Sequence, residues 1–121
     1  MAPRVLIVDD DEEIRWLVTF VLHPHVALVG EAPDGEVAVS LVRQERPDVV
    51  VIDVMMPRLD GLEATRRIKQ EYPATKVLVL TSLTDDATRS EAFEKGADAF
   101  LDKREIATVL LPTIRLVTSL A

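Results

Sequence analysis

Short apolar runs and longer amphipathic segments alternate along the chain. Runs rich in Val, Ile and Leu are typical of strands that are buried on both faces, whereas apolar residues spaced three and four positions apart are typical of helices. This criterion predicts strands at 4–8, 26–29, 48–53, 76–81 and 98–102. It also predicts a helix after each strand, so the expected order is five successive strand–helix pairs.

Capping residues, glycines and prolines predict where the helices begin and end. The first helix is expected over 12–22, after Asp11 as its N-cap and with Trp16 packed against Phe20. The second helix is expected between Asp34–Gly35 and Pro47, and the third between Asp60–Gly61 and Pro73. The fourth is expected between Thr84, as its N-cap, and Gly96.

Pro112 makes the start of the last helix harder to predict. In a helix interior, its ring would clash with the carbonyl of Thr108, whereas in a first turn it would cost little. We therefore expect 103–107 to form a turn and the last helix to begin near Thr108.

Alternating strands and helices imply a parallel sheet covered by helices on both faces, with right-handed crossovers. The predicted fold class is α/β, a (βα)5 doubly wound five-stranded sheet with the flavodoxin-like strand order 2-1-3-4-5. We found no internal repeat, low-complexity tract or interior linker, so a single domain over 1–121 is expected.

Composition and charge exclude several classes of function. The net charge is −7 and the sequence pI is near 4.8, so we expect no direct contact with nucleic acid. The chain has no cysteine, which excludes disulfides and thiol chemistry. No apolar stretch reaches the roughly 18 residues that span a membrane, and the N-terminus does not resemble a signal peptide, so a cytoplasmic location without membrane contact is expected.

Chemically active side chains follow several of the predicted strands. Asp53 closes the third apolar run, the first run ends in Asp9 and Asp10, Thr81 closes the fourth, and Lys103 follows the fifth. The carboxyl ends of parallel strands meet at one edge of the sheet, where ligands bind. Carboxylates, a hydroxyl and an ammonium at that edge indicate phosphoryl chemistry with a divalent cation, and the repelling carboxylates should keep at least one proton to higher pH than normal.

Other interpretations of the same residues are open at this point. An aspartate after a strand is commonly a helix cap or turn residue, as we expect for Asp11, Asp34, Asp60, Asp85 and Asp86, and a single lysine is commonly solvated.

Two other functions share the predicted fold. A flavin mononucleotide binder would need a loop rich in glycine and hydroxyls after the first strand. A metal-dependent phosphatase with an aspartyl-phosphate would usually have a second acid where this chain has Met55.

The motifs as a group resemble the receiver domain of two-component response regulators over essentially the whole chain. They are Val-Leu-Ile-Val-Asp-Asp-Asp at 5–11, Asp-Val-Met-Met-Pro-Arg-Leu-Asp-Gly at 53–61, Leu-Thr-Ser at 80–82 and Gly-Ala-Asp-Ala-Phe-Leu-Asp-Lys at 96–103. The segments 29–35 and 61–68 look most similar to the NarL/FixJ subfamily, whose receivers precede a LuxR-type helix-turn-helix domain.

This resemblance implies a role for each residue of the site. Asp53 matches the phosphorylated aspartate, and Asp9 and Asp10 match the acidic pair that holds Mg²⁺ (or Mn²⁺) together with Asp53 and the backbone carbonyl of Met55. The remaining matches are the switch hydroxyl Thr81, the switch aromatic Phe100 and the lysine Lys103.

One residue departs from the family pattern. Many receivers have a proline after the lysine, often with a cis peptide bond, and here Arg104 follows Lys103. Because a cis bond before a residue other than proline costs about 3–4 kcal/mol, we expect this bond to be trans.

The function implied by the resemblance is a phosphorylation-activated switch rather than an enzyme that turns over its own substrate. The expected phosphoryl source is a sensor histidine kinase or a phosphotransfer protein. The expected signal passes through the fourth helix, the fifth strand and the fifth helix to an output domain, to a partner protein or to a second copy in a homodimer. A stand-alone phosphorelay receiver is the alternative, because the chain ends at Ala121, about where a receiver ends.

Overall fold

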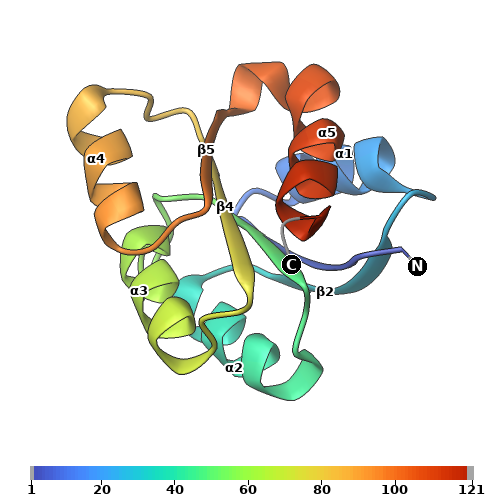
Figure 1. Cartoon of the computed structure of the whole chain (residues 1–121). Helices are drawn as coiled ribbons and strands as arrows, with labels where there is room; N and C mark the ends of the chain where they lie inside the picture. The colour runs from blue at the N-terminus through green and yellow to red at the C-terminus, as the bar shows by residue number, and fades with distance from the viewer. Residues whose placement is uncertain (1, 120–121) are drawn as a thin grey trace.

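The structure is a computed structural model that describes residues 2–119 (Figure 1). Its elements in chain order are β1 (Arg4–Val8), α1 (Glu12–Leu22), β2 (Ala27–Ala32), α2 (Gly35–Glu45), β3 (Val49–Ile52), α3 (Gly61–Glu71), β4 (Lys76–Thr81), α4 (Asp86–Glu94), β5 (Ala99–Asp102), the 3₁₀ turn η1 (Lys103–Glu105) and α5 (Ile106–Ser119).

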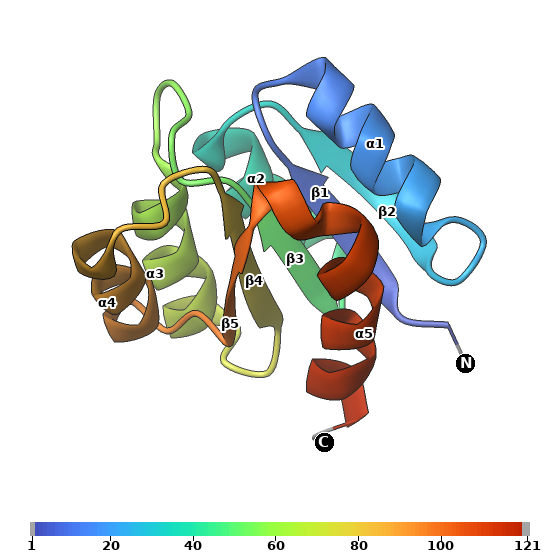
Figure 2. The same ribbon diagram turned by 90° about the horizontal axis from the view of Figure 1, so that it is seen from above.

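The five strands form one parallel sheet in the order β2-β1-β3-β4-β5. Helices cover both faces, with α1 and α5 on one and α2, α3 and α4 on the other, as Figure 2 shows. The predicted fold class and strand order are therefore confirmed.

Each face of the sheet has its own hydrophobic core, because successive side chains of a strand point to opposite faces. In β1, Leu6 and Val8 join the core under α2, α3 and α4, whereas Val5 and Ile7 join the core under α1 and α5. The central strand β3 divides its four buried residues between the two cores in the same way. This burial on both faces explains why its sequence is apolar without interruption.

Several predicted boundaries differ from those of the structure, most of them by one residue; the end of the second strand and the N-cap of the fourth helix are two of them. The second strand extends to Ala32 rather than ending at 29, because Gly30 and Glu31 pair with β1 although they interrupt the apolar run. Thr84 is not the N-cap of α4. Asp85 is, since its carboxylate accepts a hydrogen bond from the Thr88 amide at 3.0 Å.

The prediction that 103–107 would be a turn is wrong in part. The carboxylate of Asp102 accepts a hydrogen bond from the Arg104 amide at 2.9 Å and starts the 3₁₀ turn η1, which leads directly into α5 at Ile106. Pro112 consequently lies inside α5, on its exposed side. The Lys103–Arg104 bond is trans, as expected, since within 2–119 the cis peptide bonds comprise His23–Pro24 alone.

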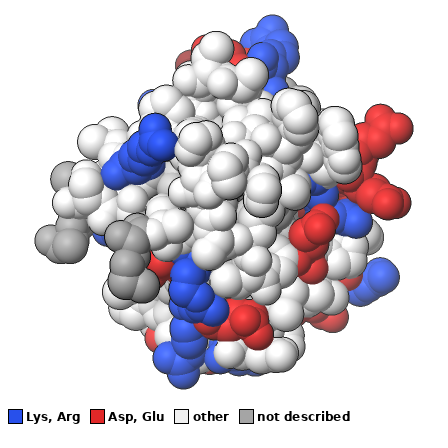
Figure 3. Space-filling view, turned by 90° about the vertical axis from the view of Figure 1, so that its right-hand side faces the viewer, with Lys and Arg blue, Asp and Glu red and all other residues white. Residues whose placement is uncertain are grey.

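Helix α1 carries an aromatic pair on its surface. The rings of Trp16 and Phe20 stack with centroids 5.5 Å apart, as the sequence predicted, but the two residues are 66% and 68% exposed. The inward side of α1 is formed by Val18 and Leu22. Figure 3 shows the side of the molecule that carries α1 and α5, and most of this side lacks charged residues.

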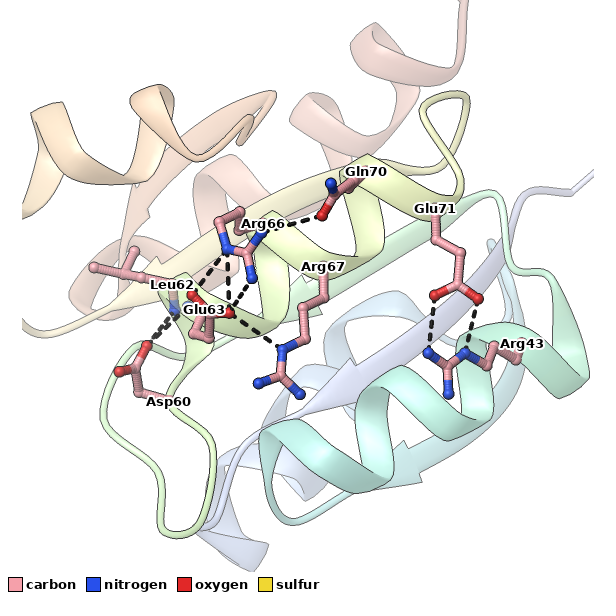
Figure 4. A network of polar contacts seen from close by, with 8 residues as sticks. All are labelled: Arg43, Asp60, Leu62, Glu63, Arg66, Arg67, Gln70 and Glu71. Atoms are coloured by element: carbon pink, nitrogen blue, oxygen red, sulfur yellow. Dashed lines mark hydrogen bonds and ion pairs between the residues drawn. The ribbon is translucent and has the colours of Figure 1, made fainter.

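The opposite layer carries a network of surface ion pairs, shown in Figure 4. Arg43 of α2 donates two hydrogen bonds to Glu71 of α3, and Glu63 accepts hydrogen bonds from Arg66 and Arg67 within α3. The bonds from Arg66 and then Arg67 lower the pKa of Glu63 to about 2. The Arg43–Glu71 pair attaches α2 to α3 on the outside, where the helices cover the sheet.

Among residues 2–119, none of the helices combines the length and the apolar character that crossing a bilayer would require.

Candidate phosphoacceptor and metal site

The acidic residues of the site follow β1 and β3, which are neighbours in the sheet. The ladder of backbone hydrogen bonds continues one residue past each strand. The Asp9 amide donates to the Ala32 carbonyl at 3.0 Å, and the Asp53 amide donates to the Val8 carbonyl at 3.0 Å. The backbone of both aspartates is therefore fixed by the sheet, and their side chains start from neighbouring positions on its edge.

Three carboxylates converge at this edge. One oxygen from each of Asp9, Asp10 and Asp53 lies within 4.8 Å of the others. Asp9 and Asp53 are buried, at 3% and 7% exposure, whereas Asp10 is exposed. Hard cations such as Mg²⁺ take carboxylate, carbonyl and water oxygens as ligands. The donor set therefore fits Mg²⁺, with one side of the cluster open to solvent.

Lys103 joins the two buried carboxylates. Its ammonium nitrogen lies 2.7 Å from Asp9 Oδ2 and 3.0 Å from Asp53 Oδ2. Burial by itself would lower the pKa of Lys103, but the hydrogen bonds to Asp9 and Asp53 together with the charges of both carboxylates outweigh it, and the pKa is raised. A protonated lysine consequently stands beside Asp53, the carboxylate that the sequence predicts to be the phosphoacceptor.

The second oxygen of each buried carboxylate is held by the backbone. Asp9 Oδ1 accepts a hydrogen bond from the Asp11 amide at 2.9 Å, and Asp53 Oδ1 accepts one from the Val54 amide at 2.7 Å. Burial raises the pKa of Asp9, against the opposing hydrogen bond from Lys103. This direction agrees with the expectation of a retained proton, although burial is a larger cause than repulsion from Asp53.

Gly61 allows α3 to begin directly against the backbone of Asp53. Its amide donates to the Val54 carbonyl at 2.8 Å, and a Cβ atom at this position would lie 1.7 Å from the Asp53 carbonyl oxygen. The preceding residue, Asp60, caps α3 by accepting hydrogen bonds from the amides of Leu62 and Glu63, as Figure 4 shows. Only glycine fits this contact.

The loop between Asp53 and α3 is also attached to the start of α2. The Gly35 amide donates to the Leu59 carbonyl at 3.0 Å, and Arg58, whose φ is 66°, pairs with the buried carboxylate of Asp34 at 3.2 Å. Asp34 is the N-cap of α2, as predicted, but its pairing with Arg58 was not foreseen. The contact between Asp34 and Arg58 joins residues far apart in the chain, and no local sequence pattern predicts it.

Thr81 and Phe100 lie on the strands next to the cluster. Thr81 is 1% exposed, and its hydroxyl accepts a hydrogen bond from the Leu83 amide at 3.1 Å. Phe100 is half-buried against the core under α2, α3 and α4, and the Arg89 guanidinium lies 5.8 Å from its ring centre. The side chain of Met55 is exposed. The structure therefore brings Asp9, Asp10, Asp53 and Lys103 into one cluster, with Thr81 and Phe100 on the adjoining strands.

A sheet of this order, with three acids and a lysine at its carboxyl edge, is the architecture of receiver domains, the phosphorylation-activated switches of two-component systems. The family model described as "Response regulator receiver domain" matches residues 5–115. The chain belongs to this family.

Individual relatives agree with this assignment. The transcriptional regulatory protein DegU of Brevibacillus brevis is 36% identical over 116 residues, which are 94% of this chain and 49% of DegU. The crystal structure of the response regulator domain of Thermotoga maritima CheB has a TM-score of 0.92 at 33% identity and covers 100% of this chain and 99% of that chain. A two-component response regulator of the LuxR family from Aurantimonas sp. SI85-9A1 has a TM-score of 0.89 at 31% identity, covering 98% of this chain and 87% of that chain.

These matches confirm the likeness to regulators with a LuxR-type output and do not favour the flavin-binding or phosphatase alternatives. The chain spans 30 to 54% of the length of the first curated relatives that it matches. The matched segment is a receiver domain, a module that generally has no substrate turnover of its own.

Proposed function

We propose that residues 1–121 act as one receiver domain in which Asp53 accepts a phosphoryl group from a phosphohistidine. The observation that carries this proposal is the Lys103 ammonium between Asp9 and Asp53, because it places a fixed positive charge beside the acceptor carboxylate. The proposed donor is a sensor histidine kinase or a phosphotransfer protein, which would set the reaction in the cytoplasm.

The proposed metal ligands are the carboxylates of Asp9, Asp10 and Asp53 and the backbone carbonyl of Met55, with Mg²⁺ or Mn²⁺ as the ion. When bound, the cation would reduce the repulsion between the acceptor carboxylate and the incoming phosphoryl oxygens. An open cleft of about 540 Å³, lined by Asp10, Met55 and Glu91 among others, lies beside the exposed side of the cluster. A phosphodonor would reach the site through this cleft.

In the proposed transfer, a bond forms between an Asp53 carboxylate oxygen and phosphorus while the bond from phosphorus to the donor imidazole breaks. The imidazole leaves with the bonding electrons. Lys103 stabilises negative charge on a phosphoryl oxygen as a compact cation, and the backbone bonds of Asp53 hold the carboxylate in position. The chain would accept one phosphoryl group in this transfer and would lose it again only by slow self-dephosphorylation. It would not turn over an independent substrate.

Asp10→Ala tests the metal assignment. We expect this variant to lose Mg²⁺-dependent phosphorylation by acetyl phosphate while remaining folded, because Asp10 is exposed and contributes mainly charge to the cluster. Without metal, its thermal midpoint should be equal to or above that of the wild type, since repulsion among the acids is relieved. Phosphorylation is followed by intact-protein mass spectrometry, and folding by circular dichroism.

The matched control for this experiment is Glu94→Ala, which also removes an exposed acidic charge, at the end of α4. This variant should be phosphorylated at the wild-type rate. Undiminished phosphorylation of Asp10→Ala would show that the metal ligands have been assigned wrongly.

The proposed switch runs from Thr81 and Phe100 to the surface formed by α4, β5 and α5. A phosphoryl group adds roughly −1.5 to −2 charges and three acceptor oxygens, which would draw in the Thr81 hydroxyl and Lys103. Helix α4 can move at low cost, because Ala92 is the one buried residue among its nine. An output domain, a partner protein or a second copy of the chain would recognise the changed surface.

Hydrogen exchange tests this route. With Mg²⁺ and a beryllofluoride mimic of the phosphoryl group, we expect the largest changes in amide exchange within 81–104, because these residues connect the site to α4 and β5. Peptides from α1 and α2 are the internal reference and should change less. Larger changes in α1 or α2 than in 81–104 would contradict the route.

A further inference from the structure

Arg15 of α1 makes two polar contacts beside the acidic cluster. Its Nη1 donates a hydrogen bond to the backbone carbonyl of Asp9 at 2.7 Å, and its Nε donates to Glu31 Oε1 at the end of β2 at 3.0 Å. The Arg15 side chain is 17% exposed, whereas that of Glu31 is 54% exposed. The guanidinium is therefore largely enclosed, and its interaction with the Asp9 carbonyl is the more sheltered of the two.

The carbonyl that Arg15 holds belongs to the peptide group joining Asp9 to Asp10. A peptide group is planar, so fixing its oxygen also fixes the direction in which the chain enters Asp10. Asp9 is further held through its own amide and its carboxylate. Asp10 is exposed, and among residues 2–119 its carboxylate accepts no hydrogen bond, so the protein restricts its position mainly through the backbone that precedes it.

We infer that Arg15 is a positioning residue for the metal site: by holding the Asp9–Asp10 peptide group, it aims the Asp10 carboxylate at the position shared with Asp9 and Asp53. This inference rests on the proposed function, because it concerns the same cation site. Nothing in the sequence distinguishes Arg15 from the other arginines of the chain. Its role follows from the contacts that α1 makes with the ends of β1 and β2.

Two effects of Arg15 on cation binding have opposite signs, and this makes the inference testable. As a positive charge near the cluster, Arg15 repels Mg²⁺, so its removal should strengthen binding. As a positioning residue it favours binding, so its removal should weaken it. Residues that orient metal ligands typically change metal affinity by about 10–100-fold when they are replaced. We therefore expect positioning to outweigh charge repulsion.

The experiment compares the Mg²⁺ dissociation constants of the wild type, Arg15→Ala, Arg15→Lys and Glu31→Gln by isothermal titration calorimetry. We expect Arg15→Ala to weaken binding about tenfold. Arg15→Lys keeps the charge but lacks the planar fork that makes both contacts, and should also bind more weakly than the wild type. Glu31→Gln leaves the bond to the Asp9 carbonyl in place and should stay within about twofold of the wild type.

A second measurement does not depend on the cation. In ¹H–¹⁵N spectra of the metal-free protein, the Asp10 amide should shift in both Arg15 variants and remain near its wild-type position in Glu31→Gln. Circular dichroism shows whether Arg15→Ala is folded. If it is not, the Mg²⁺ dissociation constant of Arg15→Lys tests the inference instead.

Equal or tighter Mg²⁺ binding by the Arg15 variants would overturn the inference and leave the proposed function standing. A loss in Glu31→Gln as large as that in Arg15→Ala would also overturn it, because the ion pair rather than the carbonyl contact would then be responsible. If the wild type itself bound no Mg²⁺, the proposed metal site and this inference would fail together.

Discussion

Asp53→Asn is expected to give a folded protein that takes no phosphoryl group from acetyl phosphate in the presence of Mg²⁺. Asparagine has nearly the same shape as aspartate, so its amide oxygen can still accept the hydrogen bond from the Val54 amide that holds Asp53 in the wild type. What is lost is the anionic oxygen, which is both the proposed nucleophile and a proposed metal ligand. Intact-protein mass spectrometry should show one added phosphoryl group on the wild type and none on the variant.

Asp102→Asn is the matched control, because Asp102 ends β5 at the same edge of the sheet and pairs with Arg104 rather than with the cluster. This control should be phosphorylated like the wild type. The wild-type modification should be released by hydroxylamine, as expected for an acyl phosphate. A hydroxylamine-resistant phosphoryl group on Thr81 or Ser82, or any phosphorylation of Asp53→Asn, would contradict the assignment of the acceptor.

The largest loss of stability is expected from Gly61→Ala. The added methyl group would lie 1.7 Å from the Asp53 carbonyl oxygen, and the backbone of Asp53, which is hydrogen-bonded to β1 directly after the central strand, cannot move aside as a flexible side chain can. The start of α3 must then shift away from Asp53, and we expect the free energy of unfolding to fall by about 3 kcal/mol or more. Urea denaturation measures this loss, and the rate of phosphorylation should fall with it, because the backbone of the acceptor is displaced.

Gly30→Ala provides the comparison. Its Cβ atom would lie 3.3 Å from Leu6 Cδ1 and 3.7 Å from Leu41 Cδ1, both at the ends of flexible side chains. We expect a change of no more than about 1 kcal/mol in the free energy of unfolding. Similar losses in the two variants would mean that the contact between Gly61 and Asp53 is not the cause.

The sheet and its order could be predicted because apolar runs that are buried on both faces have a strong sequence signature. Val49 to Ile52 is such a run, and Asp53 directly after it indicated the site edge without any structural information. Asp9 and Lys103 were predicted by the same reasoning, since each follows a strand. The structure confirms that these side chains meet.

Boundaries that depend on one local hydrogen bond were less predictable. Thr84 and Asp85 are both good N-cap residues, and Asp85 is the N-cap because its carboxylate accepts the hydrogen bond from the Thr88 amide. The early start of α5 depends on a bond that Asp102 makes to the Arg104 amide. A sequence shows which residues can form such bonds but not which of them will do so.

Away from the sheet edge, the pairing of an arginine with an acid in a distant segment could not be predicted. Arg58 pairs with Asp34 across 24 positions, and Arg15 reaches the end of a strand that begins twelve positions later. Such pairs leave no periodic pattern, because an arginine on a helix or in a loop can extend in several directions. The partner of Arg15, for example, is identified only by the folded arrangement of β1, β2 and α1.

The separation of the hydrophobic residues into two cores, one on each face of the sheet, affects how the chain can change in evolution and in the laboratory. Substitutions in one core do not contact the other, so their effects on stability should combine additively across the sheet and less so within one face. The acids and the lysine lie at the strand ends, outside both cores. Where they do not contact the sheet edge, as Arg15 and Gly61 do, the helices of either layer can therefore be redesigned for a new partner while the chemistry at that edge is kept.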